Sequence, residues 1–275
     1  MSTHMKYLLD FLDDVRAKLD KLKTALLLDY DGTLTPIVNT PDEALLNEDM
    51  RSVINKLKDN SNFIVAVFSG RSLLDVRSKV EVDGICYTGN HGMEIEFRGM
   101  IYIHPEAKKM VNIIQNVCSK LQPLLNDIDG IIIEDKGLTA SVHYRMSPPK
   151  EIPKVKRIVE STIEPYVENG DIKLTHGKMV LEIRPNIQWD KGKAVEWVLS
   201  AIGDGESTKF FPIYIGDDRT DEDAFKVLRN RGITILVSSK IKKTSAEYLL
   251  YNVEEVKNFL DWLGGVNITS VEIET

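Results

Sequence analysis

The chain has 275 residues, of which 43% are hydrophobic and 28% are charged, a composition typical of globular proteins with one large domain or two smaller ones. Its formal net charge of −7 argues against a nucleic-acid or anionic-membrane partner. Two isolated cysteines indicate a reducing compartment rather than a disulfide framework, and no apolar run reaches the roughly 18 residues that a membrane helix needs. We therefore expect a cytoplasmic protein.

The first hundred residues alternate between predicted helices and strands. An amphipathic helix is expected over residues 8–22. Three short apolar runs are typical of strands buried on both faces, and they span residues 24–29, 62–70 and 84–90. Helices are expected between them at 47–58 and 71–80. A hairpin over residues 93–104 follows, with its turn at Arg98 and Gly99.

The middle of the chain has another order, helix–strand–strand–helix–strand–strand, which is typical of an α+β layer with an antiparallel sheet. Its helices are expected at about 106–125 and from the 147–153 loop to Val167, and its strand pairs at 130–135 with 138–145 and 171–177 with 178–185. Alternation then returns, with a helix at 191–202, a strand at 209–218, a helix from Asp221, a strand at 232–238 and two helices to Leu263.

These patterns predict an α/β fold, with a doubly wound, Rossmann-like parallel sheet as core and a smaller inserted α+β domain. The core is assigned to residues 1–105 and 187–275, and the insert to residues 106–186. Such a sheet binds ligands beyond the carboxyl ends of its strands. Three apolar strands end there in polar residues, namely Asp29 and Asp31, Ser69, and Asp217 and Asp218. We expect these residues to form one site.

The residue types at these strand ends indicate a metal and an anion. Asp29 and Asp31 on one loop and Asp217 on another offer the hard oxygen ligands that Mg²⁺ prefers. Ser69 and Gly70 lie between a strand and a helix, where a hydroxyl and backbone N–H groups hold anions. The alternative interpretation of the first two aspartates is a solvated turn.

Lys191 and Asp221 each begin a predicted helix. Lysine is unfavourable at the positive end of a helix dipole, so a phosphate-binding role for Lys191 is favoured over a solvated one. The acidic run from Asp221 to Asp223 has a structural alternative, because Thr220 and Asp223 have the spacing of a capping box. The five histidines show no spacing typical of zinc.

The strings DYDGT, SGR, DKG and GDD, in this order, resemble the four motifs of the haloacid-dehalogenase-like (HAD-like) phosphatases. Longer strings, among them FSGRSLLDV, GNHGMEI and PIYIGDDRTDEDAFKVLR, are similar to the trehalose-6-phosphate phosphatase family over about residues 24–263. The resemblance implies a Mg²⁺-dependent phosphatase with a HAD-like core and an inserted cap that binds the sugar.

The resemblance also implies roles for individual residues. Asp29 would be the nucleophile, and Asp31 the general acid and base whose backbone carbonyl also binds the metal. Ser69 and Lys191 would hold the phosphoryl group, and Asp217 would complete the metal site. Asp218 and Asp221 would orient these groups. Candidate substrate-binding residues are Gly70, Arg71, Asn90, His91 and Gly92 in the core, and Glu134, Lys136, Arg145, Lys178, Glu182 and Arg184 in the insert.

Several alternatives remain open at this point. Charged residues on an antiparallel hairpin usually face water, and Arg184 has a hinge or salt-bridge role as its alternative. The substrate alternatives are sucrose phosphate, a glycosyl-glycerate phosphate or another sugar phosphate. The alternative of another class is a non-catalytic sugar-phosphate sensor or a regulatory subunit. A monomer is expected, with a trehalose-phosphate synthase as a candidate partner.

Overall fold

The structure is a computed structural model that describes residues 5–20, 22–203 and 210–265. The chain forms two compact units, one of residues 1–101 with 189–275 and one of residues 102–188. The expected insert, 106–186, lies within the second unit. Among the described residues, no helix is both long and apolar enough to cross a membrane.

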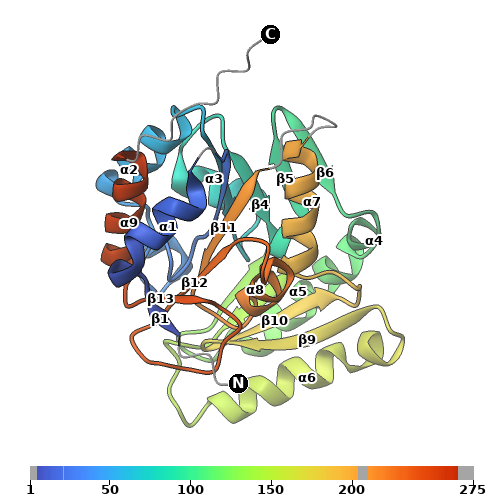
Figure 1. Ribbon diagram of the computed structural model, residues 1–275. Helices are drawn as coiled ribbons and strands as arrows, with labels where there is room; N and C mark the ends of the chain where they lie inside the picture. The colour runs from blue at the N-terminus through green and yellow to red at the C-terminus, as the bar shows by residue number, and fades with distance from the viewer. Residues whose placement is uncertain (1–4, 21, 204–209, 266–275) are drawn as a thin grey trace. The chain divides into compact units, whose positions relative to one another are not determined.

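The first unit is built on one sheet, which has nine strands among the described residues (Figure 1). In spatial order they are β1 (Lys6–Tyr7), β13 (Tyr248–Leu250), β12 (Ile233–Val237), β11 (Phe211–Gly216), β2 (Thr24–Asp29), β3 (Phe63–Phe68), β4 (Cys86–Gly89), β5 (Glu94–Phe97) and β6 (Met100–Ile103). The strands from β1 to β4 in that order are parallel, and β5 runs antiparallel to β4. The boundary between the two units falls within β6.

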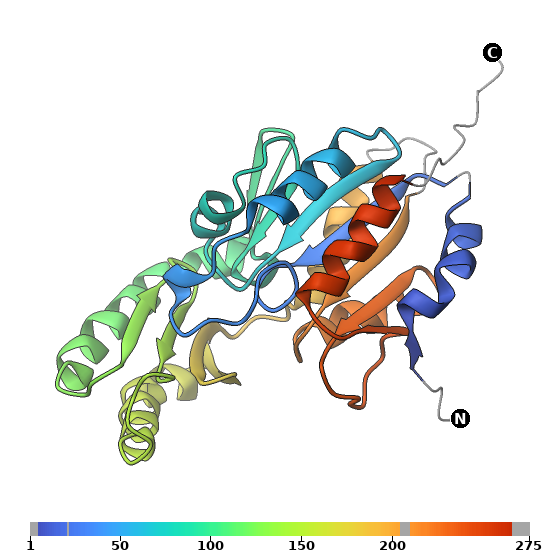
Figure 2. The same cartoon turned by 90° about the vertical axis from the view of Figure 1, so that its left-hand side faces the viewer.

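Helices cover both faces of this sheet, as a doubly wound fold requires. Leu26 and Leu28 of β2 face the core that lies under α1 (Leu12–Leu19), α2 (Glu48–Lys58), α3 (Leu73–Val80) and α9 (Val253–Gly265). Figures 1 and 2 show α2 and α9 side by side on this face. The other face carries α7 (Lys191–Gly203) and α8 (Asp221–Leu228), where the Phe225 ring meets Tyr214 of β11 edge to face at 5.8 Å. Burial on both faces explains why the central strands are continuous apolar runs.

The second unit is an antiparallel sheet with helices on one face. Its four described strands are ordered β7 (Ile132–Asp135), β8 (Ala140–His143), β10 (Val180–Pro185) and β9 (Ile172–Gly177). Alternate residues of β10, Leu181 and Ile183, pack with α5 (Val111–Leu125) and α6 (Ile152–Glu168). The residues between them, such as Glu182, lie on the opposite face of the sheet. The expected α/β fold with an α+β layer is confirmed.

Three expected elements differ from the structure. The first helix is shorter, because Lys6 and Tyr7 pair with β13 and a 3₁₀ turn over Leu8–Phe11 precedes α1. The helix expected at 106–125 is divided at Met110 into α4 (Pro105–Lys109) and α5. Of the two helices expected between 239 and 263, only the second is present, as α9, and β13 lies where the first was expected. The apolar part of β13 is only Tyr248–Leu250, too short to identify without its neighbours in the sheet.

Candidate active site

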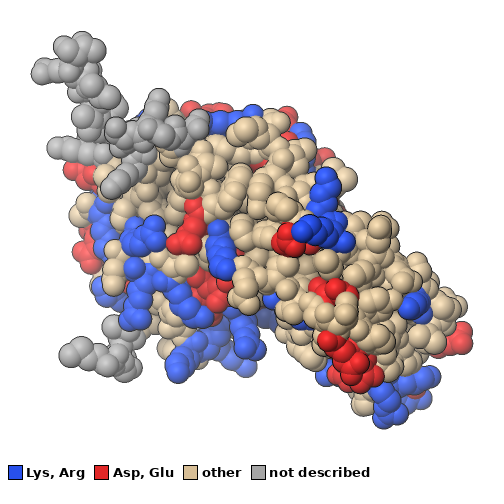
Figure 3. Space-filling view, turned by 90° about the vertical axis from the view of Figure 1, so that its right-hand side faces the viewer, with Lys and Arg blue, Asp and Glu red and all other residues tan. Residues whose placement is uncertain are grey.

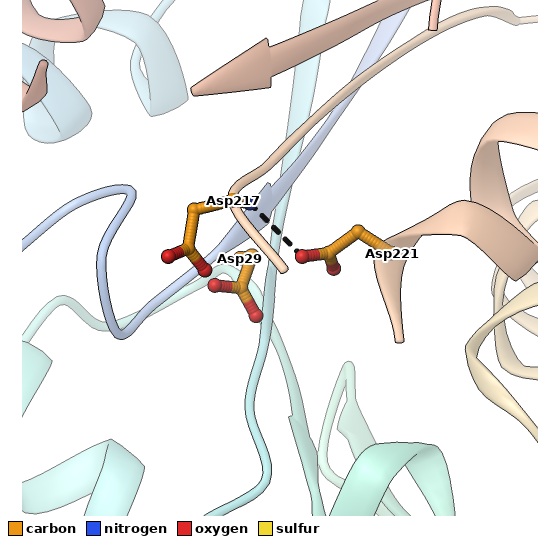
Figure 4. A group of neighbouring side chains, drawn as sticks. All are labelled: Asp29, Asp217 and Asp221. Carbon is orange, nitrogen blue, oxygen red and sulfur yellow. Dashed lines mark hydrogen bonds between the residues drawn. The ribbon is translucent and has the colours of Figure 1, made fainter. Parts of the chain in front are cut away.

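Parallel strands bring the candidate residues together at one edge of the sheet. β2 lies between β3 and β11, and these strands end at Asp29, Phe68 and Gly216. Asp29, Ser69 and Asp217 therefore lie at neighbouring strand ends, and all three are buried. A solvated turn does not describe Asp29, whose residue is only 5% exposed. Figure 4 shows the carboxylates of Asp29, Asp217 and Asp221 close together. Each residue offers one carboxylate oxygen, and these three oxygens lie within 4.8 Å of one another, as the ligands of one metal ion would.

Lys191 holds two of these carboxylates. Its Nζ donates to Asp29 Oδ1 at 2.5 Å and to Asp221 Oδ1 at 2.6 Å, and all three residues are buried. The two acids raise the pKa of the Lys191 ammonium well above its ordinary value against the opposing effect of burial. The lysine therefore remains a cation at the start of α7.

The position of Asp221 after Thr220 suggests a residue of a helix-capping turn, but its carboxylate binds side chains of other elements. Thr220 gives α8 no side-chain cap, so the expected capping box is wrong, and Asp223 pairs with Lys226 instead. The Asp221 carboxylate accepts four hydrogen bonds. The donors are Lys191 Nζ (2.6 Å) and the Tyr214 hydroxyl (2.8 Å) to Oδ1, and the backbone N–H groups of Asp217 (3.0 Å) and Asp218 (2.9 Å) to Oδ2.

Each oxygen of the Asp221 carboxylate accepts two of these hydrogen bonds, so both of its oxygens are occupied by protein donors. Asp221 thus fixes Lys191 and the backbone of the β11 end, which agrees with an orienting role rather than a direct metal-binding one. Asp218 is held locally, because its Oδ1 accepts from the Thr220 N–H at 2.7 Å and hydroxyl at 2.8 Å. Burial alone would raise the pKa of Asp218, but Lys191 and the Thr220 hydrogen bonds hold it below its ordinary value.

Two glycines make room for the acidic side chains. Gly32 has φ +90°, and a Cβ on it would lie 2.3 Å from Asp217 Oδ2. A Cβ on Gly216 would lie 2.3 Å from Asp221 Cγ. Real Cβ contacts do not reach these distances, so the loop after β2 and the end of β11 accept only glycine while these carboxylates keep their positions.

The electrostatics of the cluster fit a bound divalent cation. Burial raises the pKa of Asp29 well above its ordinary value, Lys191 opposes this, and the acids Asp221, Asp217 and Asp218 add to the increase. One buried lysine does not balance several buried carboxylates, and a further cation would let Asp29 stay ionised. Oxygen ligands of this kind suit Mg²⁺.

Asp31 lies apart from the converging carboxylates and is bound by Arg71. Arg71 Nε donates to Asp31 Oδ2 at 2.9 Å, and Nη2 donates to Oδ1 at 2.8 Å. Nη1 of the same guanidinium donates to Asp75 Oδ2 at 2.8 Å. Ser69 Oγ accepts from the Arg71 N–H at 3.1 Å, which orients the serine hydroxyl.

The Asn90–Gly92 segment adopts an uncommon backbone beside this turn. All three residues have positive φ, at 49°, 57° and 86°. The Asn90 N–H donates to Arg71 O and the His91 N–H to Ser69 O, at 2.6 and 2.9 Å. The His91 ring also covers Gly70, where a Cβ would lie 2.8 Å from Cε1. The substrate-binding candidates of the first unit, residues 70–71 and 90–92, therefore lie in one small region. Position 70 must be glycine because the His91 ring leaves no room for a Cβ.

Most candidates of the second unit gather on the face of its sheet opposite the helices. Glu134 and Glu182 both lie opposite Ser141 in the strand register. The ammonium of the buried Lys136 lies 3.8 Å from Glu134 Oε2 and 4.0 Å from Glu182 Oε1.

Arg145 lies beside Lys178, whose carbonyl accepts from Arg145 Nη2 at 2.8 Å. Arg184 is opposite Lys173 on the neighbouring strand.

Sequence reasoning overlooked two groups of this site. Tyr214 appears in the sequence as one more apolar residue of β11, yet its hydroxyl donates to Asp221. Lys242 lies in a polar loop, and its Nζ donates to the carbonyl of Asp217 at 2.8 Å. Both interactions join residues whose proximity depends on the fold, although Tyr214 in a run of aliphatic residues was a signal that could have been read.

Comparisons with known proteins agree on one family. A family model described as Trehalose-phosphatase matches residues 27–254. Trehalose-phosphate phosphatase B of Arabidopsis thaliana is 40% identical over 267 residues, which cover 93% of this chain and 70% of that protein. Trehalose 6-phosphate phosphatase RA3 of Zea mays is 41% identical over 250 residues, with 86% and 68% covered.

Among solved structures, the C-terminal domain of C. albicans trehalose-6-phosphate phosphatase is similar in fold, with a TM-score of 0.80. The two chains are 21% identical, and the match covers 95% of this chain and 99% of that one.

Proposed function

The chain belongs to the trehalose-phosphatase family and is a phosphoric monoester hydrolase, and we propose that it converts trehalose 6-phosphate to trehalose and phosphate through an aspartyl-phosphate on Asp29. The observation that carries this mechanism is the buried group at the edge of the sheet, in which Lys191 joins Asp29 to Asp221. A nucleophilic carboxylate needs a fixed position and a neighbouring cation if it is to approach an anionic substrate.

In the first step, an oxygen of Asp29 forms a bond to phosphorus while the bond from phosphorus to the sugar oxygen breaks. The leaving oxygen takes a proton from Asp31. In the second step, a water molecule gives a proton to Asp31 as its oxygen bonds to phosphorus, and the bond from phosphorus to Asp29 breaks. The products are trehalose and inorganic phosphate, and both aspartates return to their initial states.

Other residues stabilise the phosphoryl group during both steps. Ser69 and Lys191 would donate to its oxygens, because Ser69 follows the end of β3 beside Asp29 and Lys191, at the start of α7, is hydrogen-bonded to Asp29. Asp29, Asp217 and the backbone carbonyl of Asp31 would hold Mg²⁺, which supplies positive charge that offsets repulsion between Asp29 and the substrate. Asp221 and Asp218 would keep these groups in place.

Recognition of the sugar is assigned to the second unit. The buried Lys136 between Glu134 and Glu182 offers donors and acceptors for hydroxyl groups, and Arg145, Lys178 and Arg184 are further candidates. Asn90, His91 and Gly92 are proposed to contribute from the first unit. On the face drawn in Figure 3, Lys and Arg side chains lie beside Asp and Glu, so this face is not uniformly negative although the net charge is −7.

A cytoplasmic location is also proposed, because both cysteines are buried free thiols, as in proteins of reducing compartments. A monomeric state and a synthase partner stay predictions.

The test is phosphate release with Mg²⁺ from trehalose 6-phosphate, sucrose 6-phosphate, glucose 6-phosphate and p-nitrophenyl phosphate in parallel. A preference for trehalose 6-phosphate of at least about a hundredfold in kcat/KM is expected, since buried polar groups discriminate strongly among hydroxyl patterns. Lys136→Met should remove this preference and leave p-nitrophenyl phosphate turnover nearly unchanged. Similar slow turnover of all four substrates would refute the substrate but not the chemistry.

A further inference from the structure

The guanidinium of Arg71 is fixed on several sides. It pairs with both oxygens of Asp31 and with one of Asp75, and its side chain is only 8% exposed. The guanidinium carbon lies 5.7 Å from the centre of the Tyr30 ring, and the Tyr30 hydroxyl donates to Ala44 O at 2.8 Å. A planar guanidinium held in this way cannot turn without breaking several contacts.

Asp75 is itself held by the start of α3. Its N–H donates to Ser72 Oγ at 3.2 Å, which caps the helix, and an acid in the first turn is favoured by the helix dipole. Lys79 Nζ lies 3.9 Å from the other Asp75 oxygen and donates to Asp42 O at 3.2 Å. The orientation of Arg71 is therefore determined by α3 and the loop after β2 together.

Among the residues that the structure describes, Arg71 is the side chain that binds the Asp31 carboxylate. The Asp31 side chain is 37% exposed, so without Arg71 it would sample several rotamers. A carboxylate has about four lone-pair positions, and a two-pronged arginine occupies one on each oxygen. The remaining two positions face away from Arg71. The arginine thereby determines the direction in which Asp31 can exchange a proton.

We propose that Arg71 is a positioning residue for Asp31, which fixes the general acid in the orientation from which it protonates the leaving sugar oxygen. This assignment differs from the substrate-binding role expected from the sequence, and it rests on the proposed function. The proton still passes from Asp31 to the oxygen that leaves phosphorus, and Arg71 neither gains nor loses a proton.

The proposal predicts an effect that depends on the leaving group. A sugar alkoxide is a poor leaving group and needs a proton, whereas p-nitrophenolate leaves without one. The parameter kcat/KM covers only the steps up to departure of the leaving group, so it isolates the first chemical step. Loss of Arg71 should therefore lower kcat/KM for trehalose 6-phosphate far more than for p-nitrophenyl phosphate.

The experiment compares Arg71→Met, Asp31→Asn and the double variant with Arg77→Met, which removes an exposed arginine of α3 that pairs with Glu96. Arg71→Met and Asp31→Asn should each lower kcat/KM for trehalose 6-phosphate by about 10²-fold or more, the usual size of a general-acid effect. For p-nitrophenyl phosphate the loss should stay within about fivefold. The double variant should be no worse than Asp31→Asn alone, and Arg77→Met should match the wild type.

Equal losses on both substrates, or losses that add to those of Asp31→Asn, would overturn the proposal and indicate direct phosphate or sugar binding by Arg71. If Arg71→Met does not fold, Asp75→Asn removes the other ion pair of the guanidinium and should give the same selectivity in weaker form. If the wild type hydrolyses p-nitrophenyl phosphate but not trehalose 6-phosphate, the substrate assignment fails, and the comparison is repeated with glucose 6-phosphate as the poor leaving group.

Discussion

Lys191 and Asp29 are 162 positions apart in the sequence, yet Lys191 Nζ lies 2.5 Å from Asp29 Oδ1 in a buried ion pair. Lys191→Met removes the only charged donor that this structure gives Asp29 among the described residues. We expect kcat to fall by about 10²–10³-fold or more for sugar and aryl phosphates alike, because the phosphoryl group itself loses a donor. Steady-state kinetics on both substrates measure this.

Lys193→Met is the matched control, since Lys193 lies on the same helix and is exposed. It should leave kcat within about twofold of the wild type. A Lys191→Met variant that keeps more than a tenth of the wild-type kcat would contradict the role assigned to this ion pair.

The sequence was sufficient to predict that Asp29, Ser69 and Asp217 meet, because adjacent parallel strands end at one edge of a sheet. Lys191 lies at the start of α7, and its place in this site was added by the family resemblance. It was not sufficient for interactions that depend on exact side-chain positions. The hydrogen bonds of Asp221 to Lys191 and Tyr214 join α8, α7 and β11, and no local pattern contains all three. The capping spacing at Thr220 was a plausible local explanation that the tertiary contacts replaced.

Tyr214→Phe removes one hydroxyl from the interior and changes nothing else in composition. The hydroxyl donates to Asp221 Oδ1 at 2.8 Å, and burial raises the pKa of Tyr214 well above its ordinary value, so the phenol stays a neutral donor. A hydrogen bond to a charged group contributes about 1.5–3 kcal/mol. We expect a lower melting temperature and a kcat about three- to tenfold lower, with KM little changed.

Tyr87→Phe separates these two effects, because its hydroxyl is also buried but donates to Val82 O at 2.7 Å. It should lower the melting temperature and leave kcat unchanged. If Tyr214→Phe also changed only the melting temperature, the hydroxyl would be structural and would not support Lys191.

Gly216→Ala tests how closely Asp221 approaches the end of β11. The added Cβ would lie 2.3 Å from Asp221 Cγ, so the carboxylate must move and release part of its four hydrogen bonds. We expect kcat to fall by at least tenfold and stability by about 1–3 kcal/mol, as in other overpacked sites. Kinetics and urea unfolding measure the two effects.

Gly203→Ala is the matched control, since it lies at the end of α7 and, among the described residues outside its own helix backbone, a Cβ there meets no atom within 4 Å. Alanine is the better helix former, so stability should be equal or slightly higher and kcat unchanged. Equal behaviour of the two variants would mean that the strand end can adjust, contrary to the contacts described.

The two thiols give a test of packing in each unit. Burial raises the pKa of Cys86 to about 12 and of Cys118 to about 12, with smaller contributions from Glu96 and Asp135. A thiol is protonated below its pKa, so at pH 8 only about 10⁻⁴ of each is the reactive thiolate. We expect the native protein to react slowly with iodoacetamide at pH 8 and two thiols to react quickly in guanidinium chloride.

The native rate should rise about tenfold for each pH unit up to pH 10 and reach no plateau there, provided that the fold persists. Mass spectrometry of the labelled peptides distinguishes Cys86 in the first unit from Cys118 in the second. Complete labelling of either thiol within seconds at pH 8 would show that its surroundings are more open than the structure describes.

Removal of the metal tests the charge balance of the carboxylate cluster. Asp29 and Asp217 are buried, and Lys191 alone does not balance them and Asp221. We expect EDTA to abolish phosphatase activity and excess Mg²⁺ to restore it. Independently of activity, Mg²⁺ at 100 times its dissociation constant should stabilise the folded protein by about 2.7 kcal/mol, seen as a higher melting temperature.

Asp217→Asn keeps the shape of the side chain against Gly32 but removes its charge, so the rise in melting temperature with Mg²⁺ should be largely lost. Without Mg²⁺, this variant should be at least as stable as the wild type, because one of several repelling buried carboxylates is gone. Asp83→Asn, at a fully exposed side chain, should respond to Mg²⁺ as the wild type does. If Mg²⁺ stabilised Asp217→Asn and the wild type equally, the ion would bind elsewhere, and the ligand assignment of Asp217 would be wrong.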